Sequence, residues 1–288
     1  MPPTVDAPMQ ERFAAFTFVD RITDFKAGRS ARGHFDVPAG LAHFAGTLTA
    51  EAIGQLAAWV AMEHVGFRSR PVAALARDCR YLGDVVPGQR LSLEVDIEHC
   101  DDESIVYRGS ASVEGQRVRE LDDCLGPMLP LTDFDDPELM REHFELLCGP
   151  GAAPGRFGGV PEPQLSNIEH DPGQRVSASL AVPHSAAFFA DHFPRRAVFP
   201  ATLLLEAGAS LALQLAAGLP PAPGRMRFAL TRVTDVKVRS FTPPGQTLEL
   251  AASLRELASD TATVALSAHV AGKRMASAGF EFHAGSRT

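Results

Sequence analysis

One long pattern occurs twice in this 288-residue chain, and a repeat limits the possible folds more strongly than any single motif. AGRSARGHFDVP at residues 27–38 matches PGQRVSASLAVP at residues 172–183 in its glycine, its alternation and its final proline. VVPGQRLSLEVDI at residues 85–97 matches TPPGQTLELAASL at residues 242–254. These segments alternate apolar and polar residues near Pro-Gly turns, which predicts antiparallel strands in two similar halves.

Each half also contains a strongly apolar stretch with one acid at its fourth position. These stretches are LTAEAIGQLAAW at residues 48–59 and LLLEAGASLALQ at residues 203–214. Both are apolar on nearly every side, which predicts a buried helix. A buried helix beside an antiparallel sheet is typical of an α+β fold, so we expect each sheet to wrap around one central helix.

A Gly- and Pro-rich segment separates the halves. GPGAAPGRFGGVPEP at residues 149–163 cannot sustain a helix or an interior strand and is interpreted as a linker. The preceding DDPELMREHFELLC begins with acids and a proline and has helical spacing, which predicts a linking helix. We therefore expect an N-terminal repeat at residues 1–132, a linking helix and linker at residues 133–163, and a C-terminal repeat at residues 164–288.

Charge and cysteine content make several partners unlikely on physical grounds. The net charge is -8 at pH 7, and residues 1–148 carry 14 Lys and Arg against 25 Asp and Glu, whereas residues 149–288 carry 13 against 10. No basic stripe with interleaved aromatic residues occurs, so nucleic acid is not an expected partner, while an acidic protein could approach the second half. The four cysteines lie far apart without a CxxC pair, which predicts neither a zinc site nor a disulfide framework.

Two segments bear on location. The N-terminal MPPTVDAP has neither a basic region nor an apolar run of signal-peptide length, so we expect a cytoplasmic protein. The most apolar run is TLLLEAGASLALQLAAGL at residues 202–219, but Glu206 and Gln214 fall inside it. Charged groups at that depth are costly in lipid, so a buried helix of a protein without a membrane partner is expected.

A loop in the second half carries a family resemblance. DHFPRRAVFPATLLLE at residues 191–206 places a His in an HFP loop, a Pro before the helix, and an acid fourteen residues after the His. This spacing resembles the β-hydroxyacyl-acyl-carrier-protein dehydratases of bacterial fatty-acid synthesis. The first half resembles the same family through FTFVDRITDF, AGTLTAEAIGQLAAW and VVPGQRLSLEV. The resemblance covers most of the chain apart from the linker and implies a tandem, or double, hotdog fold.

The two halves depart from the family in complementary ways. The first half is about ten residues shorter where the His loop should be, and Val37 stands at the position of the His. It keeps Gly46, five residues before Glu51, and Gln55, four residues after it. The second half keeps the His loop but has Ala201 and Ser210 at the corresponding two places.

The resemblance implies one composite active site, because each site of the family takes its His from one hotdog and its acid from the other. His192 is then the candidate base, and Glu51 the candidate acid with a pKa raised by burial. The backbone N–H of Gly46 is a candidate oxyanion donor, and Gln55 either orients Glu51 or satisfies another neighbour. Glu206 is interpreted as a remnant of a second site. Neither a metal nor an organic cofactor is expected.

The second half also carries basic residues suited to an acidic carrier. Arg195 and Arg196 lie beside His192, and Lys237 and Arg239 lie in VKVRSFTPPG, which resembles a basic strand near the family's substrate entrance. We expect an acyl carrier protein, or another acyl thioester, to dock there. The chain is expected as a monomeric pseudo-dimer or as a homodimer of double hotdogs.

Three functions remain open at this point. The leading hypothesis is a dehydratase that eliminates water from a 3-hydroxyacyl thioester in fatty-acid or polyketide-type synthesis. A hotdog acyl thioesterase is the second, because such folds also hydrolyse thioesters with a helix carboxylate, although the His in the HFP loop disfavours it. A catalytically inactive hotdog partner of a synthase is the third. The R-specific enoyl hydratases are disfavoured, because their Asp-to-His motif is missing from this sequence.

Overall fold

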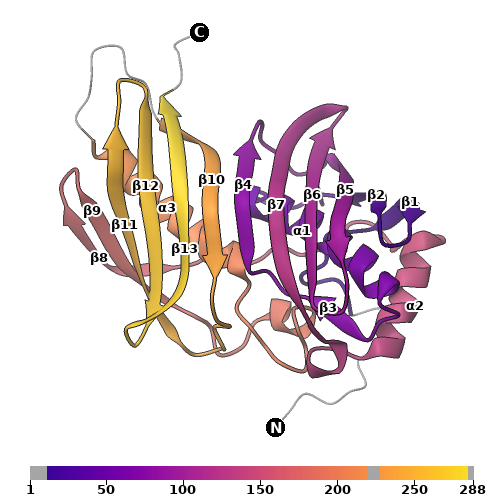
Figure 1. Cartoon of the computed structure of the whole chain (residues 1–288). Coiled ribbons are helices and arrows are strands. Elements are labelled where there is room, and N and C mark those ends of the chain that lie inside the picture. The colour runs from indigo at the N-terminus through magenta and orange to yellow at the C-terminus, as the bar shows by residue number, and fades with distance from the viewer. Residues whose placement is uncertain (1–11, 220–227, 285–288) are drawn as a thin grey trace.

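A single antiparallel sheet extends through the whole molecule (Figure 1). The computed structural model describes residues 12–219 and 228–284. In spatial order, the strands of the first half are β1 (Arg21–Lys26), β2 (Ser30–Asp36), β5 (Arg90–Cys100), β6 (Ser104–Val113), β7 (Gln116–Pro130) and β4 (Leu75–Tyr81), and the short β3 (Ser69–Pro71) also pairs with β7.

The second half repeats this order in reverse. From the centre outward its strands are β10 (Phe228–Val238), β13 (Lys273–Ala284), β12 (Thr261–Val270), β11 (Thr247–Leu257), β9 (Arg175–Ala181) and β8 (Leu165–Asp171). The halves join where β4 pairs with β10, with Val233 opposite Cys79. Arg232 of β10 closes this seam with two hydrogen bonds to the Asp78 carboxylate of β4, at 2.6 and 3.1 Å. The sheet therefore has a pseudo-twofold axis at the seam.

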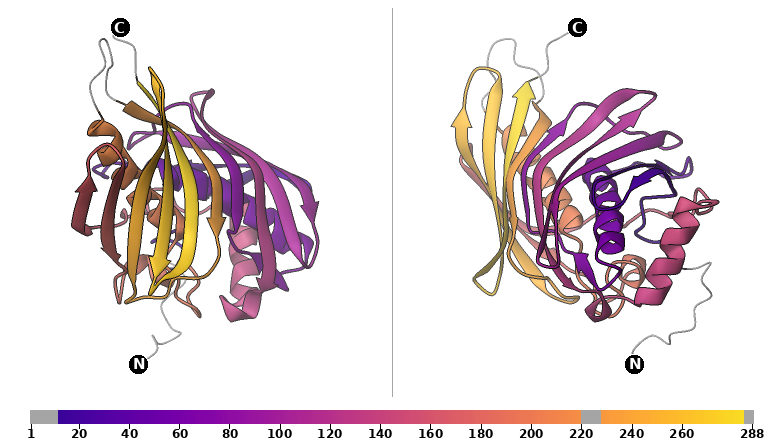
Figure 2. Two further views of the ribbon diagram at one scale, coloured as in Figure 1. Left: turned by 60° about the vertical axis from the view of Figure 1, so that its left-hand side comes forward. Right: turned by 45° about the vertical axis from the view of Figure 1, so that its right-hand side comes forward.

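Each half curves around one central helix, as the apolar stretches predict. These helices are α1 (Gly46–His64) and α3 (Ala201–Ala217), and Figure 2 shows them on the inner side of the sheet. They pack against each other as well as against their own strands. Within the described residues, no helix combines the length and apolarity needed to cross a bilayer.

The predicted linking helix is α2 (Pro137–Cys148), and it lies at the outer edge of the first half beside β1 (Figure 1). It begins at Asp136, whose side chain accepts the backbone N–H groups of Glu138 and Leu139. This is the arrangement that an Asp followed by Pro favours at a helix start. Two single-turn 3-10 helices, η1 (Leu131–Asp133) and η2 (Ala187–Ala190), complete the described elements.

Residues 149–163 contain neither helix nor strand, yet they pack against the first half. Phe157 is only 3% exposed, and its ring contacts the rings of Phe18, Phe35 and Phe44. This segment therefore covers the part of the first half where the loop before α1 is short. The division of the chain at residues 132 and 163 stays a prediction.

Gly109 of β6 lies in close contact with α1. A Cβ atom there would collide with Cγ2 of Ile53 and lie 2.8 Å from the backbone oxygen of Glu94. We expect Gly109→Ala to lower the free energy of unfolding by about 1–3 kcal/mol, because overpacking forces the helix or the neighbouring strand to move. Gly40→Ala is the matched control, since nothing lies within 4 Å of its new methyl group. Urea denaturation would measure both, and equal midpoints would contradict this packing.

Candidate active site

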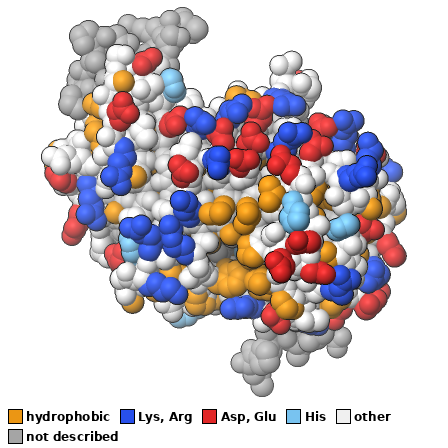
Figure 3. All heavy atoms as spheres, viewed as in Figure 1, with side chains coloured by type: hydrophobic (Ala, Val, Ile, Leu, Met, Phe, Trp, Pro, Cys, Tyr) orange, Lys and Arg blue, Asp and Glu red, His pale blue; other side chains and the backbone are white. Residues whose placement is uncertain are grey.

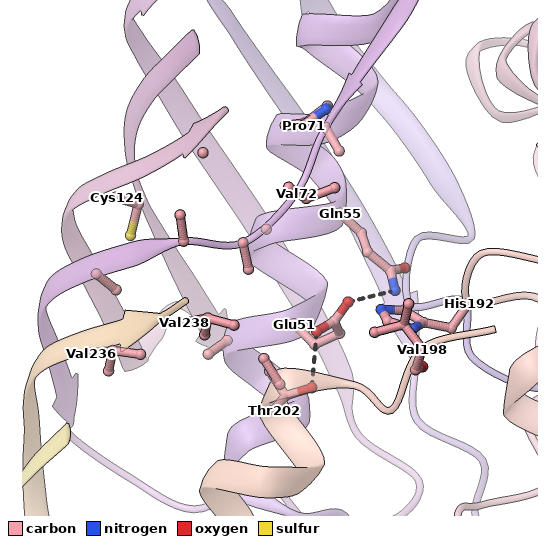
Figure 4. A pocket seen from close by; sticks show the side chains of 18 of the residues that line it. Glu51, Gln55, Pro71, Val72, Cys124, His192, Val198, Thr202, Val236 and Val238 are labelled. Atoms are coloured by element: carbon pink, nitrogen blue, oxygen red, sulfur yellow. Dashed lines mark hydrogen bonds between the residues drawn. The ribbon is translucent and has the colours of Figure 1, made fainter. Parts of the chain in front are cut away.

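One cavity of about 250 Å³ lies between α1, the start of α3 and the loop that carries His192 (Figure 4). Glu51, Gln55 and His192 all line it, although they come from different halves of the chain. In Figure 4 these three side chains project toward one another. Most of the remaining wall is apolar and includes Val72, Leu125, Val236 and Val238. The cavity thus places a carboxyl, an amide and an imidazole in an apolar surrounding.

Both oxygens of the Glu51 carboxylate accept hydrogen bonds. Gln55, one turn later on α1, donates to Oε1 at 3.1 Å, and the Thr202 hydroxyl of α3 donates to Oε2 at 2.9 Å. Burial raises the pKa of Glu51, while the bonds from Gln55 and Thr202 and the charge of Arg70 oppose that rise. A carboxyl in these surroundings can hold a proton at a higher pH than an exposed one.

Gln55 is fixed in one orientation by the backbone near the N-terminus. Its oxygen accepts the N–H of Phe18 at 2.9 Å, and its nitrogen donates to the carbonyl of Phe16 at 3.0 Å. The amide therefore cannot turn over without losing both bonds, and it always presents N–H to Glu51. Of the two roles left open by the sequence, the hydrogen bonds support both: Gln55 orients Glu51 and also satisfies this backbone.

The orientation of His192 is fixed by a hydrogen bond within its own loop. Its Nδ1 lies 3.0 Å from the carbonyl oxygen of Val198, which requires Nδ1 to carry the hydrogen and leaves the lone pair of the neutral ring on Nε2. Burial lowers the pKa of His192 to about 4, against a smaller opposing effect of the Val198 bond. The ring stacks on Phe193, whose positive φ of 63° is uncommon for an aromatic residue. A neutral, oriented imidazole can accept a proton at Nε2.

Asp191, next to His192, ties the loop of the second half to the first half. Its carboxylate accepts the backbone N–H groups of Phe13, Ala15 and Phe16. Phe16 then packs edge-on against the His192 ring. The backbone of the same segment also hydrogen-bonds to Gln55. One short stretch of backbone thus contacts both the His192 loop of the second half and the Gln55 side chain of the first. Sequence reasoning missed Asp191, although it forms part of the quoted DHFP segment.

Glu206 lies at the pseudo-symmetric position and has different neighbours. It accepts a hydrogen bond from the Thr47 hydroxyl of α1 at 2.8 Å, which mirrors the bond from Thr202 to Glu51. Glu206 does not line the cavity described above. Arg119 and Tyr81 lie close enough for the charge of Glu206 to raise the pKa of both, and the Arg119 guanidinium lies 3.3 Å from the centre of the Tyr81 ring. An arginine of β7 and a tyrosine of β4 therefore stand near this acid, whereas His192 stands near Glu51.

Gly46, the expected oxyanion donor, does not line the cavity of Glu51 and His192. A Cβ atom on it would meet Arg119 and Tyr81, each at 3.0 Å, so it faces the neighbours of Glu206 instead. The reason is helical geometry, because a separation of five residues turns about 140° around the axis and rises about 7.5 Å. Ala201, the first residue of α3, does line the cavity. The structure therefore groups the start of α3, rather than that of α1, with His192.

The four basic residues proposed for carrier docking have unequal surroundings. Arg195 forms an ion pair with Asp136 at 2.8 Å, and Arg196 packs over the Phe241 ring, 4.8 Å from its centre. Lys237 and Arg239 are exposed at the end of β10, beside the segment through Ser240 and Phe241 that lines the cavity. In Figure 3, hydrophobic side chains gather in a hollow below the β4–β10 seam, with basic side chains beside them.

Two family models match the chain, one in each half. A FabA-like domain matches residues 11–122, and an ApeI-like dehydratase matches residues 168–279. Among curated proteins, the 3-hydroxyacyl-acyl-carrier-protein dehydratase FabZ of Bacillus velezensis is 34% identical over 116 residues, which cover 36% of this chain and 82% of that protein. The chain belongs to the hotdog dehydratase family.

Other similarities are partial. The FabZ of Roseiflexus sp. strain RS-1 is 35% identical over 83 residues, which cover 29% of this chain and 57% of that protein. The chain thus spans little more than half the length of this relative. Among solved structures, a MaoC-like dehydratase has a TM-score of 0.54 at 13% identity, with 90% of this chain and 98% of that one covered. An acyl-CoA thioesterase II from Mycobacterium marinum has a TM-score of 0.53 at 12% identity, with 98% of each chain covered. At these identities the structures show the fold alone, and they confirm the predicted α+β double hotdog.

The bond from Thr202 is one of two side-chain hydrogen bonds that favour the charged form of Glu51, and it comes from the other half of the chain. We expect Thr202→Val to raise the pKa of Glu51, because the hydroxyl favours the charged carboxylate and the isopropyl group cannot replace it. Thr47→Val is the matched control, since Thr47 binds Glu206 instead. Carboxyl ¹³C NMR titration, with Glu51→Gln for assignment, would follow the shift. An unchanged Glu51 titration in Thr202→Val would refute this role.

Proposed function

We propose that this protein is a 3-hydroxyacyl-thioester dehydratase, a lyase that eliminates water to give the 2-enoyl thioester. The observation that carries the proposal is that the His192 imidazole and the Glu51 carboxyl, from different halves, lie on the wall of one largely apolar cavity. The family membership supports the same reaction class. Fatty-acid or polyketide-type synthesis is the proposed setting, with the substrate carried as a thioester on an acyl carrier protein.

In the proposed reaction, Nε2 of neutral His192 removes a proton from C2 of the bound 3-hydroxyacyl thioester. The lowered pKa of His192, about 4, keeps the ring neutral and ready to accept that proton at physiological pH. Protonated Glu51 donates its proton to the departing C3 hydroxyl, the C3–O bond breaks, and water leaves as the double bond forms. The raised pKa of Glu51 favours the protonated form that this step requires. Of its two oxygens, Oε2 suits the transfer, because a Thr hydroxyl can accept as well as donate.

Negative charge gathers on the thioester oxygen while the C2 proton leaves. The backbone N–H of Ala201 is the proposed donor, since Ala201 lines the cavity and the first N–H groups of a helix have no partner within it. Ala201 thus takes the role of oxyanion donor that the sequence analysis gave to Gly46. The chemistry needs no metal or organic cofactor, because each proton transfer has a protein group assigned to it. One chain supplies both sides of the site, so a single pseudo-dimer would suffice.

Thioester hydrolysis is the competing reaction. A carboxylate on a central helix could activate water, and thioesterases share this fold. However, hydrolysis gives no role to His192 and its fixed Nε2, whereas elimination uses both groups. The two reactions differ in their products. Hydrolysis gives a free thiol and a carboxylic acid, whereas elimination gives water and leaves the thioester bond intact.

The deciding experiment compares three substitutions in one assay. His192→Ala and Glu51→Gln should each lower kcat by about 10²–10⁴-fold, because base and acid act in the same transition state. Glu206→Gln should keep most of the rate, since Glu206 does not line the cavity. Mass spectrometry of 3-hydroxyacyl thioesters would detect the loss of water, and a thiol reagent would detect hydrolysis. Normal turnover by Glu51→Gln, or free thiol as the product, would overturn the proposal.

We further propose that the carrier docks beside Arg196 and Arg239, near the cavity residues Ser240 and Phe241. Carrier proteins of this kind are acidic, and steering by exposed charges weakens as salt rises. Arg195 is a weaker candidate, because Asp136 already neutralises it. Lys237 remains a candidate because it is exposed on the same strand end as Arg239.

Reversing Arg196 and Arg239 to Glu should raise KM for a carrier-bound substrate on the order of tenfold. The same variant should leave KM for a small thioester analogue nearly unchanged, because the analogue does not touch the docking surface. Arg175→Glu with Arg255→Glu is the matched control, since these exposed arginines on β9 and β11 give the same change in charge. Steady-state kinetics at low and high salt would test this, and equal effects on both substrates would exclude the docking surface.

A further inference from the structure

Arg70 of β3 places a positive charge in the wall of the cavity. It directly precedes Pro71 and Val72, which Figure 4 shows on that wall. Its guanidinium lies 4.3 Å from the centre of the Phe193 ring, and Phe193 stacks on His192. Its charge also acts on both His192 and Glu51. Arg70 is therefore close to the proposed reacting groups, but the proposed elimination gives it no role.

The three carboxylates that line this cavity already have partners. Glu51 accepts from Gln55 and Thr202, and Asp191 accepts three backbone N–H groups. Asp135 accepts from Arg12 at 2.9 Å and from the N–H of Asp136. Each of these acids is thus occupied within the protein.

Arg70 differs from these acids because the charges of Asp135 and Glu51 act on it, but neither acid forms an ion pair with it. Within residues 12–219 and 228–284 its side chain forms neither an ion pair nor a hydrogen bond, and its Nε is completely buried without an acceptor. Burial lowers the pKa of Arg70 to about 10, so the group is still a cation at neutral pH. Stacking on Phe193 offsets only part of the cost of removing a cation from water. An anion inside the cavity would supply the missing partner.

The rest of the lining indicates what kind of anion would fit. Near the later turns of α1, the cavity is bounded by Trp59 and Met62, and Met140 of α2 also lines it. Such walls accept hydrocarbon, whereas the guanidinium offers a planar fork of donors that matches a carboxylate. A chain that ends in methyl would leave Arg70 unpaired, and an unpaired buried charge penalises the wrong ligand strongly.

We propose that Arg70 is a specificity-determining residue that binds a carboxylate on the acyl group, so that the substrates are thioesters of 3-hydroxy dicarboxylic acids. This inference rests on the proposed dehydratase function and names its substrate class. The charge balance of the cavity supports it, because Asp135, the acid that acts most strongly on Arg70, is already paired with Arg12, and a protonated Glu51 carries no charge. The proposal also gives a role to an arginine in a wall that is mostly apolar.

The test uses matched pairs of N-acetylcysteamine thioesters. The 3-hydroxyglutaryl, 3-hydroxyadipyl and 3-hydroxysuberyl thioesters would each be compared with the methyl-ended thioester of the same carbon number. We expect kcat/KM to favour at least one dicarboxylic member over its partner on the order of tenfold to a hundredfold. Arg70→Met should abolish that preference by slowing the dicarboxylic substrate much more than its methyl-ended partner, and Arg70→Lys should keep part of it.

The outcomes separate this inference from the proposed function. A wild-type enzyme that dehydrates the methyl-ended thioesters as well as, or better than, the dicarboxylic ones would overturn the role of Arg70 and leave the dehydratase proposal standing. No loss of water from any thioester would instead refute the dehydratase. An equal loss by Arg70→Met on both classes would mean that Arg70 only supports Phe193 and His192. If Arg70→Met fails to fold, the wild-type preference and Arg70→Lys still decide.

Discussion

The pairing of β4 with β10 is the contact on which the rest of this structure depends. It joins two curved sheets edge to edge, and the bidentate ion pair between Arg232 and Asp78 holds that edge in register. Because each sheet carries its helix on the inner side, joining the sheets also brings α1 against α3. The cavity exists only because of this contact, since its wall takes residues from both helices. Neither half could form this site alone, because Glu51 comes from the first half and His192 from the second.

The crossed bonds between the helices show how symmetry and asymmetry coexist here. Thr202 donates a hydrogen bond to Glu51 and Thr47 donates one to Glu206, so the pseudo-twofold axis relates the two bonds. What differs is the surface opposite each acid. The loop with His192 stands on one side, and the stacked pair Arg119 and Tyr81 lies near the other. The loss of one loop has therefore changed the neighbours of Glu206 while leaving the helix contact intact.

The N-terminal segment and the linker stabilise this asymmetric arrangement. Residues 13–18 bind Asp191 of one half and Gln55 of the other, so they connect the base to the groups that hold the acid. The linker packs Phe157 into the aromatic cluster beneath the shortened loop of the first half. Burial of these aromatic rings stabilises the folded state, which a linker exposed to solvent would not do. Residues 13–18 and the linker are thus part of the structure that positions the site.

The sequence by itself determined the repeated architecture, because strand alternation, apolar helices and Pro-Gly turns are local patterns with fixed periods. It also led to His192 and Glu51, through a spacing shared with the family. Thr202 could have been found in the same way, since a Thr stands four residues before the acid in both halves. Gly46 was assigned to the wrong surroundings, because the direction in which a helix start faces depends on how two helices pack. Only the tertiary structure decided the bond between Thr202 and Glu51, 151 residues apart, and the place of Arg70 in the cavity, because side chains that meet across a domain interface leave no periodic signal in the chain.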